Sequence, residues 1–377
     1  MISSPIFYLL SLAFVATFFT VLEQKTSIKI FKFVPAVVMI YASSMILASL
    51  GVFNQNEAIN SLYANTKKNL LPAMLFLMLL QVDFRHFFKL GRSLLISYVL
   101  AVVSLAFGFI IVSLVFNFNQ GMASAFGALA GSWMGGTANM VAVGSALGVP
   151  DEAFGYALIV DSVNYSVWVM FLLFLVPFAT YFNKFTDSHE RVAKLSDIGC
   201  ACNMGAKRYW LLILLSIVVA YVVNTIAFWE IQILNYTTTT VILATILGVL
   251  GSFTKLKTLN GSNEVAITML YILIALIGSK AVFASFSDVG TYVLAGFIVL
   301  MIHAVIMVIG AKIFSLDLFS IAVSSLANIG GVASAPILAA TYNKALVSVG
   351  VLMAVMGYII GTFGGLAVGT LLMELAK

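Results

Sequence analysis

Apolar runs separated by short polar breaks extend through the whole sequence. Each run is roughly 16–25 residues long, close to the ~20 residues that a helix needs to cross the hydrocarbon core of a bilayer. The runs are continuously apolar and do not alternate, which excludes the pattern of a transmembrane β-barrel. We therefore predict an all-α polytopic membrane protein with full spans near 5–22, 34–53, 70–82, 94–116, 154–182, 209–228, 238–253, 265–279, 290–314 and 346–372.

Two further apolar segments, 122–147 and 319–342, are interrupted by glycine and small polar residues. The first contains "GSWMGGTANM" and the second "SSLANIGGVASAP". In hydrocarbon an unsatisfied backbone N–H or C=O costs several kcal/mol. A helix broken at mid-depth is therefore tolerated only where protein, water, an ion or a solute completes its hydrogen bonds.

Short matches at a nearly constant offset of 194 or 195 residues indicate an internal duplication. They pair 74–76 with 269–271, "YVLA" at 98–101 with "YVLA" at 292–295, and Gly135-Gly136 with Gly330-Gly331. The longest hydrophilic stretch, 183–208, divides the chain near its middle. We expect a first repeat over 1–182, a cytoplasmic linker over 183–208 and a second repeat over 209–377.

Basic residues in the loops predict the orientation, because Lys and Arg accumulate on the cytoplasmic side. They cluster in four loops, at Lys25, Lys29 and Lys32, at Arg85, Lys89 and Arg92, at Lys184, Arg191, Lys194, Lys207 and Arg208, and at Lys255 and Lys257. Placing all four loops inside puts the N-terminus outside and makes both broken segments re-entrant hairpins. The second repeat is then inverted relative to the first. In the alternative, both segments cross completely and the chain has twelve spans in parallel repeats.

Composition limits the functional classes. Hydrophobic residues make up 62% of the chain and charged residues 9%, whereas a soluble domain carries about a quarter charged residues. The net charge of +5 is too diffuse for nucleic acid, so we expect membrane lipid and a small solute as partners. The first apolar run has no basic residue before it and no clear cleavage site after it, which predicts a retained span.

The sequence contains no recognisable catalytic or nucleotide-binding motif, which disfavours an enzyme and ATP-driven transport. Cys200 and Cys202 with His189 offer too few ligands for a zinc site. We expect no metal and no cofactor, with Na⁺ or H⁺ as a coupling ion.

The residues around the two glycine pairs are the candidate solute site. A helix that starts after such a break directs its N–H groups and positive dipole end at the tip, which suits a carboxylate. The predicted solute-binding residues are Ser132, Gly135, Gly136, Thr137, Asn139, Asn328, Gly330, Gly331 and Ser334. The alternative is close helix packing through the G-x-x-x-G series Gly127, Gly131 and Gly135.

Asp161 is the candidate ion-coupling residue, because ionisable groups inside spans are rare and mark functional sites. Ser162 and Asn164 accompany it in "YALIVDSVNYSVW", and their oxygens suit Na⁺ or a proton relay. The alternative is a hydrogen-bonded, neutral Asp near an interface. His303 is interpreted as a hydrogen-bonded core histidine.

The whole chain resembles a family of uncharacterised bacterial integral membrane proteins whose signature is similar to "GSWMGGTANM" followed by "DSVNYS". That family is similar to sodium-coupled glutamate symporters and 2-hydroxycarboxylate transporters. The resemblance implies inverted repeats, hairpins whose tips bind a carboxylate beside Na⁺, an elevator-type motion, a homodimer and a location in the bacterial inner membrane. The chain departs from the pattern because its second hairpin and final span contain no Arg, which leaves a zwitterionic or neutral solute open.

These features together predict a secondary active transporter for a small organic solute that carries a carboxylate, coupled to Na⁺ or H⁺. A cation/proton antiporter that uses Asp161 is the alternative. A membrane-embedded enzyme and a channel are remoter alternatives.

Overall fold

The computed structural model describes residues 1–25, 36–54, 56–80, 90–188, 205–229, 236–281, 289–343 and 346–376. Several residues used in the sequence predictions lie outside these ranges. They are Lys29, Lys32, Arg85, Lys89, His189, Arg191, Lys194, Cys200 and Cys202, so most of the predicted linker is among them.

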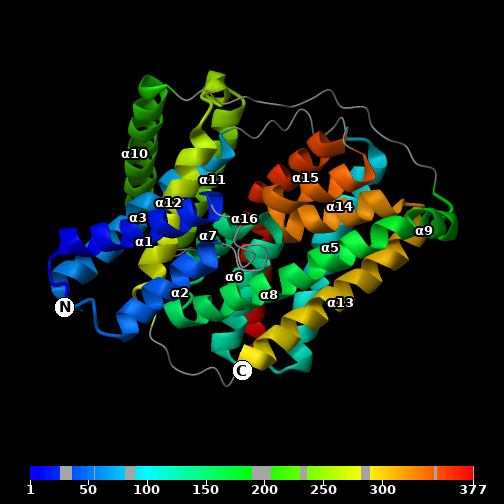
Figure 1. Cartoon of the computed structure of the whole chain (residues 1–377), viewed down its shortest axis with the longest axis horizontal. Helices are drawn as coiled ribbons and strands as arrows, with labels where there is room; N and C mark the ends of the chain where they lie inside the picture. Colours follow the sequence, from blue (N-terminus) through cyan, green and yellow to red (C-terminus); the bar gives the residue numbers. More distant parts are fainter. Residues whose placement is uncertain are drawn as a thin grey trace. The chain divides into compact units, whose positions relative to one another are not determined.

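Within the described ranges the chain is built from helices (Figure 1). One isolated β-bridge pairs Ile2 with Phe53. The α-helices are α1 (Pro5–Lys25), α2 (Ala36–Ser49), α3 (Glu57–Leu79), α5 (Arg92–Val115), α6 (Gln120–Gly135), α7 (Thr137–Ala146), α8 (Asp151–Leu175), α9 (Ala179–Thr186), α10 (Ala206–Trp229), α11 (Tyr236–Ser252), α12 (Ser262–Gly278), α13 (Val289–Phe314), α14 (Leu318–Ile329), α15 (Gly331–Tyr342) and α16 (Val347–Leu375). Two 3-10 turns, η2 (Val176–Phe178) and η3 (Lys255–Thr258), complete the set.

Six helical segments among the described residues are long and apolar enough to cross a membrane. They are Pro5–Glu23, Arg92–Val115, Asp151–Thr186, Ala206–Phe228, Val289–Phe314 and Val349–Leu375. Each exceeds or approaches the ~20 residues that span a hydrocarbon core. The prediction of a helical integral membrane protein is confirmed at this level.

The elements differ from the ten predicted spans in several places. The predicted spans 34–53, 238–253 and 265–279 correspond to α2, α11 and α12, which have 14, 17 and 17 residues and are shorter than the six candidate spans. The expected span 154–182 is not one helix: α8 ends at Leu175, a 3-10 turn containing Pro177 follows, and α9 begins at Ala179. Proline lacks the N–H that would continue the helix. The expected span 70–82 belongs to the longer α3, which begins at Glu57 because the Asn56 side chain accepts a hydrogen bond from the N–H of Ile59.

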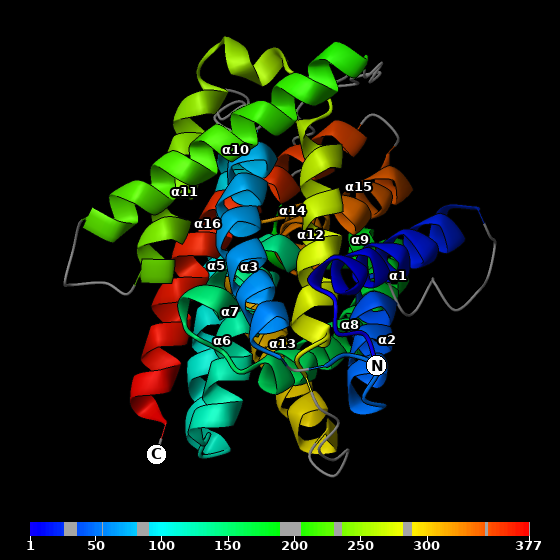
Figure 2. The same cartoon turned by 90° about the vertical axis from the view of Figure 1, so that its left-hand side faces the viewer.

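The chain divides into two compact units, and each unit takes segments from both halves of the sequence. Unit 1 comprises residues 1–81, 144–163 and 202–290. Its centre is α3, which packs against α10, α11 and α12, as Figure 2 shows. Gly248 permits this contact, because an added Cβ there would lie 2.7 Å from Cβ of Leu79.

Unit 2 comprises residues 82–143, 164–201 and 291–377. Its centre is α16, which packs against α5, α6, α14 and α15. Both glycine pairs that interrupt the predicted broken segments belong to this unit.

Candidate functional site

The first break lies between α6 and α7 at Gly136. This residue has φ 88° and ψ 173°, a combination that is essentially confined to glycine. Its N–H still bonds to the carbonyl of Ser132, and its own carbonyl accepts from Asn139 and Met140 in the first turn of α7. The N–H groups of Thr137 and Ala138 therefore have no acceptor within their own helix, as at any helix start.

The two helices at this break fold back on each other. A Cβ added at Gly131 would lie 2.8 Å from the carbonyl oxygen of Asn139 and 2.9 Å from Cγ2 of Val143. In an uninterrupted helix Gly131 and Val143 would be ~18 Å apart. The segment is thus a helical hairpin whose turn is at Gly136.

The second break lies between α14 and α15. The Asp317 side chain caps α14 by accepting from the N–H of Ser320. Helix α14 ends at Ile329, and Gly331 takes a positive φ of 61°. Helices α14 and α15 pack side by side (Figure 1), so this segment also folds back on itself.

Both hairpins contact one face of α16. A Cβ at Gly350 would lie 2.7 Å from the carbonyl oxygen of Ala335 in α15. A Cβ at Gly357 would lie 3.0 Å from Cα of Gly135 in α6. Gly350 and Gly357 are seven residues apart, which places them on the same face and ~10 Å apart along the helix axis.

The first hairpin reaches the middle of α16 from the C-terminal end of that helix. At the start of α6, the side-chain amide of Gln120 donates to the carbonyl of Met373, near the C-terminal end of α16. From there α6 runs beside α16 (Figure 2) past Gly365 and on to Gly357. The second hairpin contacts α16 nearer its N-terminal end, at Gly350. The first break therefore lies beside the central turns of α16, and the second hairpin contacts the helix ~10 Å away, toward its N-terminal end.

Glycine packing accounts for part of the first motif. A Cβ at Gly365 would lie 2.6 Å from Cα of Gly131, and a Cβ at Gly135 would collide with the carbonyl of Gly357 and with Asn139. The packing alternative is thus confirmed for Gly131 and Gly135. It does not extend to the second residue of each pair, because a Cβ at Gly136 or Gly331 would meet no atom within 4 Å.

Asn139 is fully engaged in holding the first hairpin against α16. Its side-chain nitrogen donates to the carbonyls of Gly135 at 2.9 Å and Gly357 at 3.1 Å, and its oxygen accepts from the hydroxyl of Thr362 at 2.7 Å. Asn139 is buried, and so is Ser132 one turn before the break. Thr137, at the first position of α7, is partly exposed.

The second break has polar atoms with no hydrogen-bond partner among the described residues. Ser334 is 195 positions after Asn139. Its hydroxyl and the ring of Tyr165 both lie against Gly330, and the hydroxyl has no hydrogen-bond partner among the described residues. Asn328 donates to the carbonyl of Ser324, but its side-chain oxygen has no partner either. Both side chains are buried, and a buried polar atom without a partner calls for a ligand or a water molecule.

No charged side chain lies in α6, α7, α14 or α15. The charged residues of unit 2, among those described, are near helix ends: Arg92, Lys184, Asp187, Lys312, Asp317 and Glu374. A solute at the two breaks would therefore meet hydroxyl, amide and backbone groups.

The predicted ion-coupling residues are divided between the units. Asp161 is partly exposed and Ser162 is buried, both in the portion of α8 that belongs to unit 1. Asn164 is buried in unit 2, where its side-chain nitrogen donates to the carbonyl of Val293.

Unit 1 contains a polar cluster that the sequence analysis did not identify. The hydroxyl of Tyr63 donates to the carboxylate of Asp151 at 3.1 and 3.2 Å, and the hydroxyl of Tyr41 donates to the Asp151 carbonyl. The ammonium groups of Lys67 and Lys280 lie 5.8 and 5.5 Å from the centre of the Tyr63 ring. These residues come from four distant segments, so no local motif indicates their proximity.

His303 is confirmed as a hydrogen-bonded core histidine. The hydroxyl of Ser104 donates to the carbonyl of Ala101, so Nδ1 of His303 carries the proton and donates to Ser104. Nε2 then accepts from Ser325, whose oxygen accepts from the indole N–H of Trp168. This chain of bonds connects α5, α13, α14 and α8.

The comparison with protein families agrees with a membrane protein of this kind. The model of DUF819, a family described as a protein of unknown function, matches residues 10–375. The chain belongs to the DUF819 family. A search of the curated proteins finds no match. In this DUF819 protein the matched region includes both glycine breaks, α16, five of the six candidate spans in full and most of Pro5–Glu23.

Proposed function

We propose that this DUF819 protein is a secondary active transporter that binds a small organic solute at the two glycine breaks. The observation that carries the proposal is the contact of both hairpins with one face of α16, the first at its central turns and the second toward its N-terminal end. Inverted repeats with interrupted helices that meet at mid-membrane are typical of secondary transporters. The positions of Asn139 and Ser334, each folded over the glycine four residues earlier at an offset of 195, support the duplication.

The chemistry of the breaks favours a solute with a carboxylate and further hydrogen-bonding groups. The amides of Thr137 and Ala138, at the positive end of α7, suit a carboxylate oxygen. The side-chain oxygen of Asn328 accepts only, so it would take a donor from the solute or a cation. The hydroxyl of Ser334 can donate or accept.

The remaining predicted residues would shape the site without contacting the solute. Asn139 fixes Gly135 against α16, and Gly136 and Gly331 leave space where any side chain would intrude. Gly330 and Ser132 complete the turns. Proline at position 336 has no N–H, so the carbonyl of Val332 lacks its helical donor and provides another oxygen near the second break.

Asp161, with Ser162 and Asn164, is the proposed coupling site for Na⁺ or H⁺. We further propose that the protein has inverted repeats, works by an elevator-type motion and forms a homodimer. It would lie in the bacterial inner membrane with its N-terminus outside. A cation/proton antiporter that uses Asp161 alone is the second candidate, favoured by the single acidic residue in the middle of α8.

Purified protein in proteoliposomes tests the proposal. We expect a carboxylate or amino acid to stabilise the purified protein in a thermal-shift screen only when Na⁺ is present. The same solute, labelled, should then show counterflow in proteoliposomes that depends on Na⁺ or on a proton gradient. Ser334→Ala should weaken solute affinity, whereas the control Ser113→Ala should not, since the Ser113 hydroxyl bonds only to the carbonyl of Ile110 in α5. Asp161→Asn should remove the ion dependence.

Three results would contradict the proposal. Proton release on Na⁺ addition without any organic solute would indicate the antiporter. Sustained current without counterflow would indicate a channel. Equal solute affinity in Ser334→Ala and wild type would separate the second break from solute binding.

A further inference from the structure

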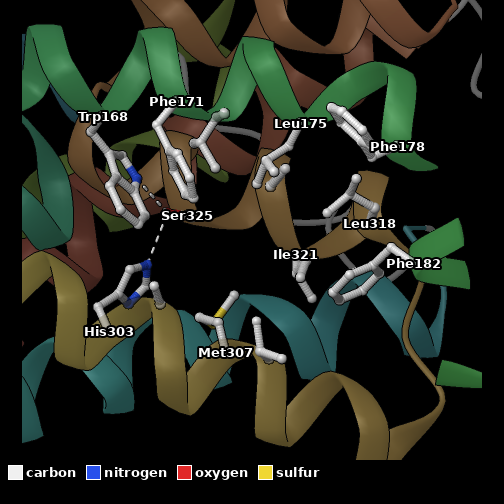
Figure 3. A pocket seen from close by; sticks show the side chains of 14 residues that line it. Trp168, Phe171, Leu175, Phe178, Phe182, His303, Met307, Leu318, Ile321 and Ser325 are labelled. Atoms are coloured by element: carbon white, nitrogen blue, oxygen red, sulfur yellow. Dashed lines mark hydrogen bonds between the residues drawn. The ribbon is translucent and has the colours of Figure 1, made fainter. Parts of the chain in front are cut away.

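Unit 2 contains a cavity of about 220 Å³ that lies apart from the two glycine breaks. Figure 3 shows its walls: α8 on one side, α13 on the other and α14 between them, with Phe178 and Phe182 at one end. None of the proposed solute-binding or ion-coupling residues lines it. The transport proposal therefore does not account for this cavity.

The walls of the cavity are apolar. Three polar groups reach it, from Trp168, His303 and Ser325, but they bond to one another at its inner end (Figure 3). A polar ligand would find no free donor or acceptor among them. An apolar cavity of about 150 Å³ in another protein stays dry and binds benzene, so a larger one with the same lining suits a hydrocarbon group.

The cavity opens toward surface that is itself apolar. Phe171 and Val308 line the cavity and are 39% exposed each. On the same helices the neighbouring side chains of Phe174, Val305 and Ile309 are more exposed still. Helices α8 and α13 both belong to candidate membrane spans, so this surface faces acyl chains when the protein is in a bilayer.

The outer end of the cavity has the character of a membrane–water interface. Helix α9 turns Phe182 toward the cavity and exposes Tyr181 and Phe185. Lys184 lies in its last turn, whereas Lys312 of α13 donates to the carbonyl of Phe185 and forms an ion pair with Asp187. Aromatic and basic side chains gather where a bilayer meets water, and lysines there attract lipid phosphates.

We infer that one acyl chain of a membrane phospholipid occupies this cavity, with its headgroup beside α9 and its end against Trp168 and Ser325. The site is distinct from the proposed solute site. Leu318, Ile321 and Ala322 of the cavity wall belong to α14, the first arm of the second hairpin. The acyl chain thus fills the space between that hairpin and the α8–α13 pair, and its loss would leave an unfilled void against the hairpin.

Quenching of tryptophan fluorescence by brominated lipid tests this site directly. Trp168 is 2% exposed, so lipid outside the protein has little access to its ring, whereas a chain in the cavity touches it. The chain offers two reference residues: Trp133 is buried in α6 and Trp210 is 68% exposed in α10. Single-tryptophan proteins would be reconstituted in nanodiscs of phosphatidylcholine brominated near the end of one acyl chain.

The expected result is quenching of Trp168 to at least half the extent of Trp210 and at least threefold more than Trp133. Ala304→Phe, which fills the cavity, should reduce quenching of Trp168 to the Trp133 level. Val305→Phe on the exposed face of α13 should leave it unchanged. Ala322→Leu fills the same space from α14, and it replaces Ala304→Phe in the test if that variant does not fold.

Two results would overturn the inference. One is quenching of Trp168 no stronger than that of Trp133, or unaffected by both filling variants. The other is quenching by a brominated free fatty acid added to unlabelled nanodiscs but not by the brominated phospholipid, which would assign the cavity to a diffusible amphiphile. Neither result bears on solute counterflow, so this test is independent of the transport proposal.

Discussion

The hydroxyl of Thr362 in α16 donates to the side-chain oxygen of Asn139 in α7 at a distance of 2.7 Å. The same asparagine bonds to carbonyls of Gly135 and Gly357. The buried side chain of Asn139 thus connects α6, α7 and α16 around the first break. Loss of one of its hydrogen bonds should therefore lower the free energy of unfolding.

Thr362→Val should lower the free energy of unfolding of the purified protein by about 1–3 kcal/mol, because it leaves the buried oxygen of Asn139 without a donor. Thr245→Val is the matched control, since the buried hydroxyl of Thr245 bonds only to the carbonyl of Val241 in its own helix. Thermal unfolding in detergent measures both. Equal losses in the two variants would show that the bond to Asn139 contributes nothing specific.

Gly136→Ala should destabilise the protein by about 1–3 kcal/mol through backbone strain alone, because its φ and ψ suit only glycine and its surroundings are open. Gly135→Ala should cost more, since its Cβ would collide with the backbone of α16. Gly290→Ala, in open space at the start of α13, should change stability little or raise it. A Gly136 variant as stable as wild type would argue against this backbone conformation.

Ser325→Ala should lower stability by about 1–3 kcal/mol, because it leaves the indole N–H of Trp168 and Nε2 of His303 unpaired in the interior. Its neighbour Ser324 is the control: it is equally buried, but its hydroxyl bonds only to the carbonyl of Ser320. Thermal unfolding of Ser325→Ala and Ser324→Ala should therefore differ, and identical values would contradict the network.

The ion pair between Lys312 and Asp187 predicts a pH effect. The Lys312 ammonium, 2.7 Å from the carboxylate, holds the pKa of Asp187 below its ordinary value. A lowered folded-state pKa stabilises the protein above the unfolded pKa, and this stabilisation is lost as pH falls through the folded value. The melting temperatures of wild type and Asp187→Asn should thus differ slightly at neutral pH and converge in acid. Since both groups are exposed, 1 M salt should also reduce the difference.

The proposed inverted topology predicts the accessibility of three positions. In a chain with Cys200 and Cys202 replaced by Ser, an impermeant thiol reagent should label Glu152→Cys and Glu374→Cys from outside. Lys207→Cys should react only from the cytoplasm. If segment 122–147 crosses the bilayer completely, Glu152→Cys becomes cytoplasmic, and that result would replace the hairpins with crossing helices.

The positions of the breaks were predictable because two adjacent glycines among small polar residues favour no other structure in an apolar segment. The interruption near Pro177 was also visible in the sequence, yet hydropathy alone joined α8 and α9 into one span. The long apolar helices were likewise predictable from the length of the apolar runs. The first half of α3 is polar, so hydropathy missed it, and its start depends on the N-cap at Asn56.

The roles of individual site residues depended on contacts between distant segments. From the sequence, Asn139 and Ser334 were equivalent candidates for solute binding. Their difference depends on tertiary packing: the side-chain oxygen of Asn139 accepts a hydrogen bond from Thr362 of α16, whereas the hydroxyl of Ser334 has no partner among the described residues. The G-x-x-x-G series predicted a close contact without naming α16. Tyr63 and Asp151 are 88 positions apart, so their bond is a property of tertiary packing alone.

The absence of charge from both hairpins determines how the membrane potential could act on transport. Moving one elementary charge through 100 mV costs or releases ~2.3 kcal/mol. If α6, α7, α14 and α15 shift across the field, their side chains carry no formal charge with them. Any voltage dependence of that step then reports the net valence of the bound cargo, and recordings at several holding potentials would count its charges directly.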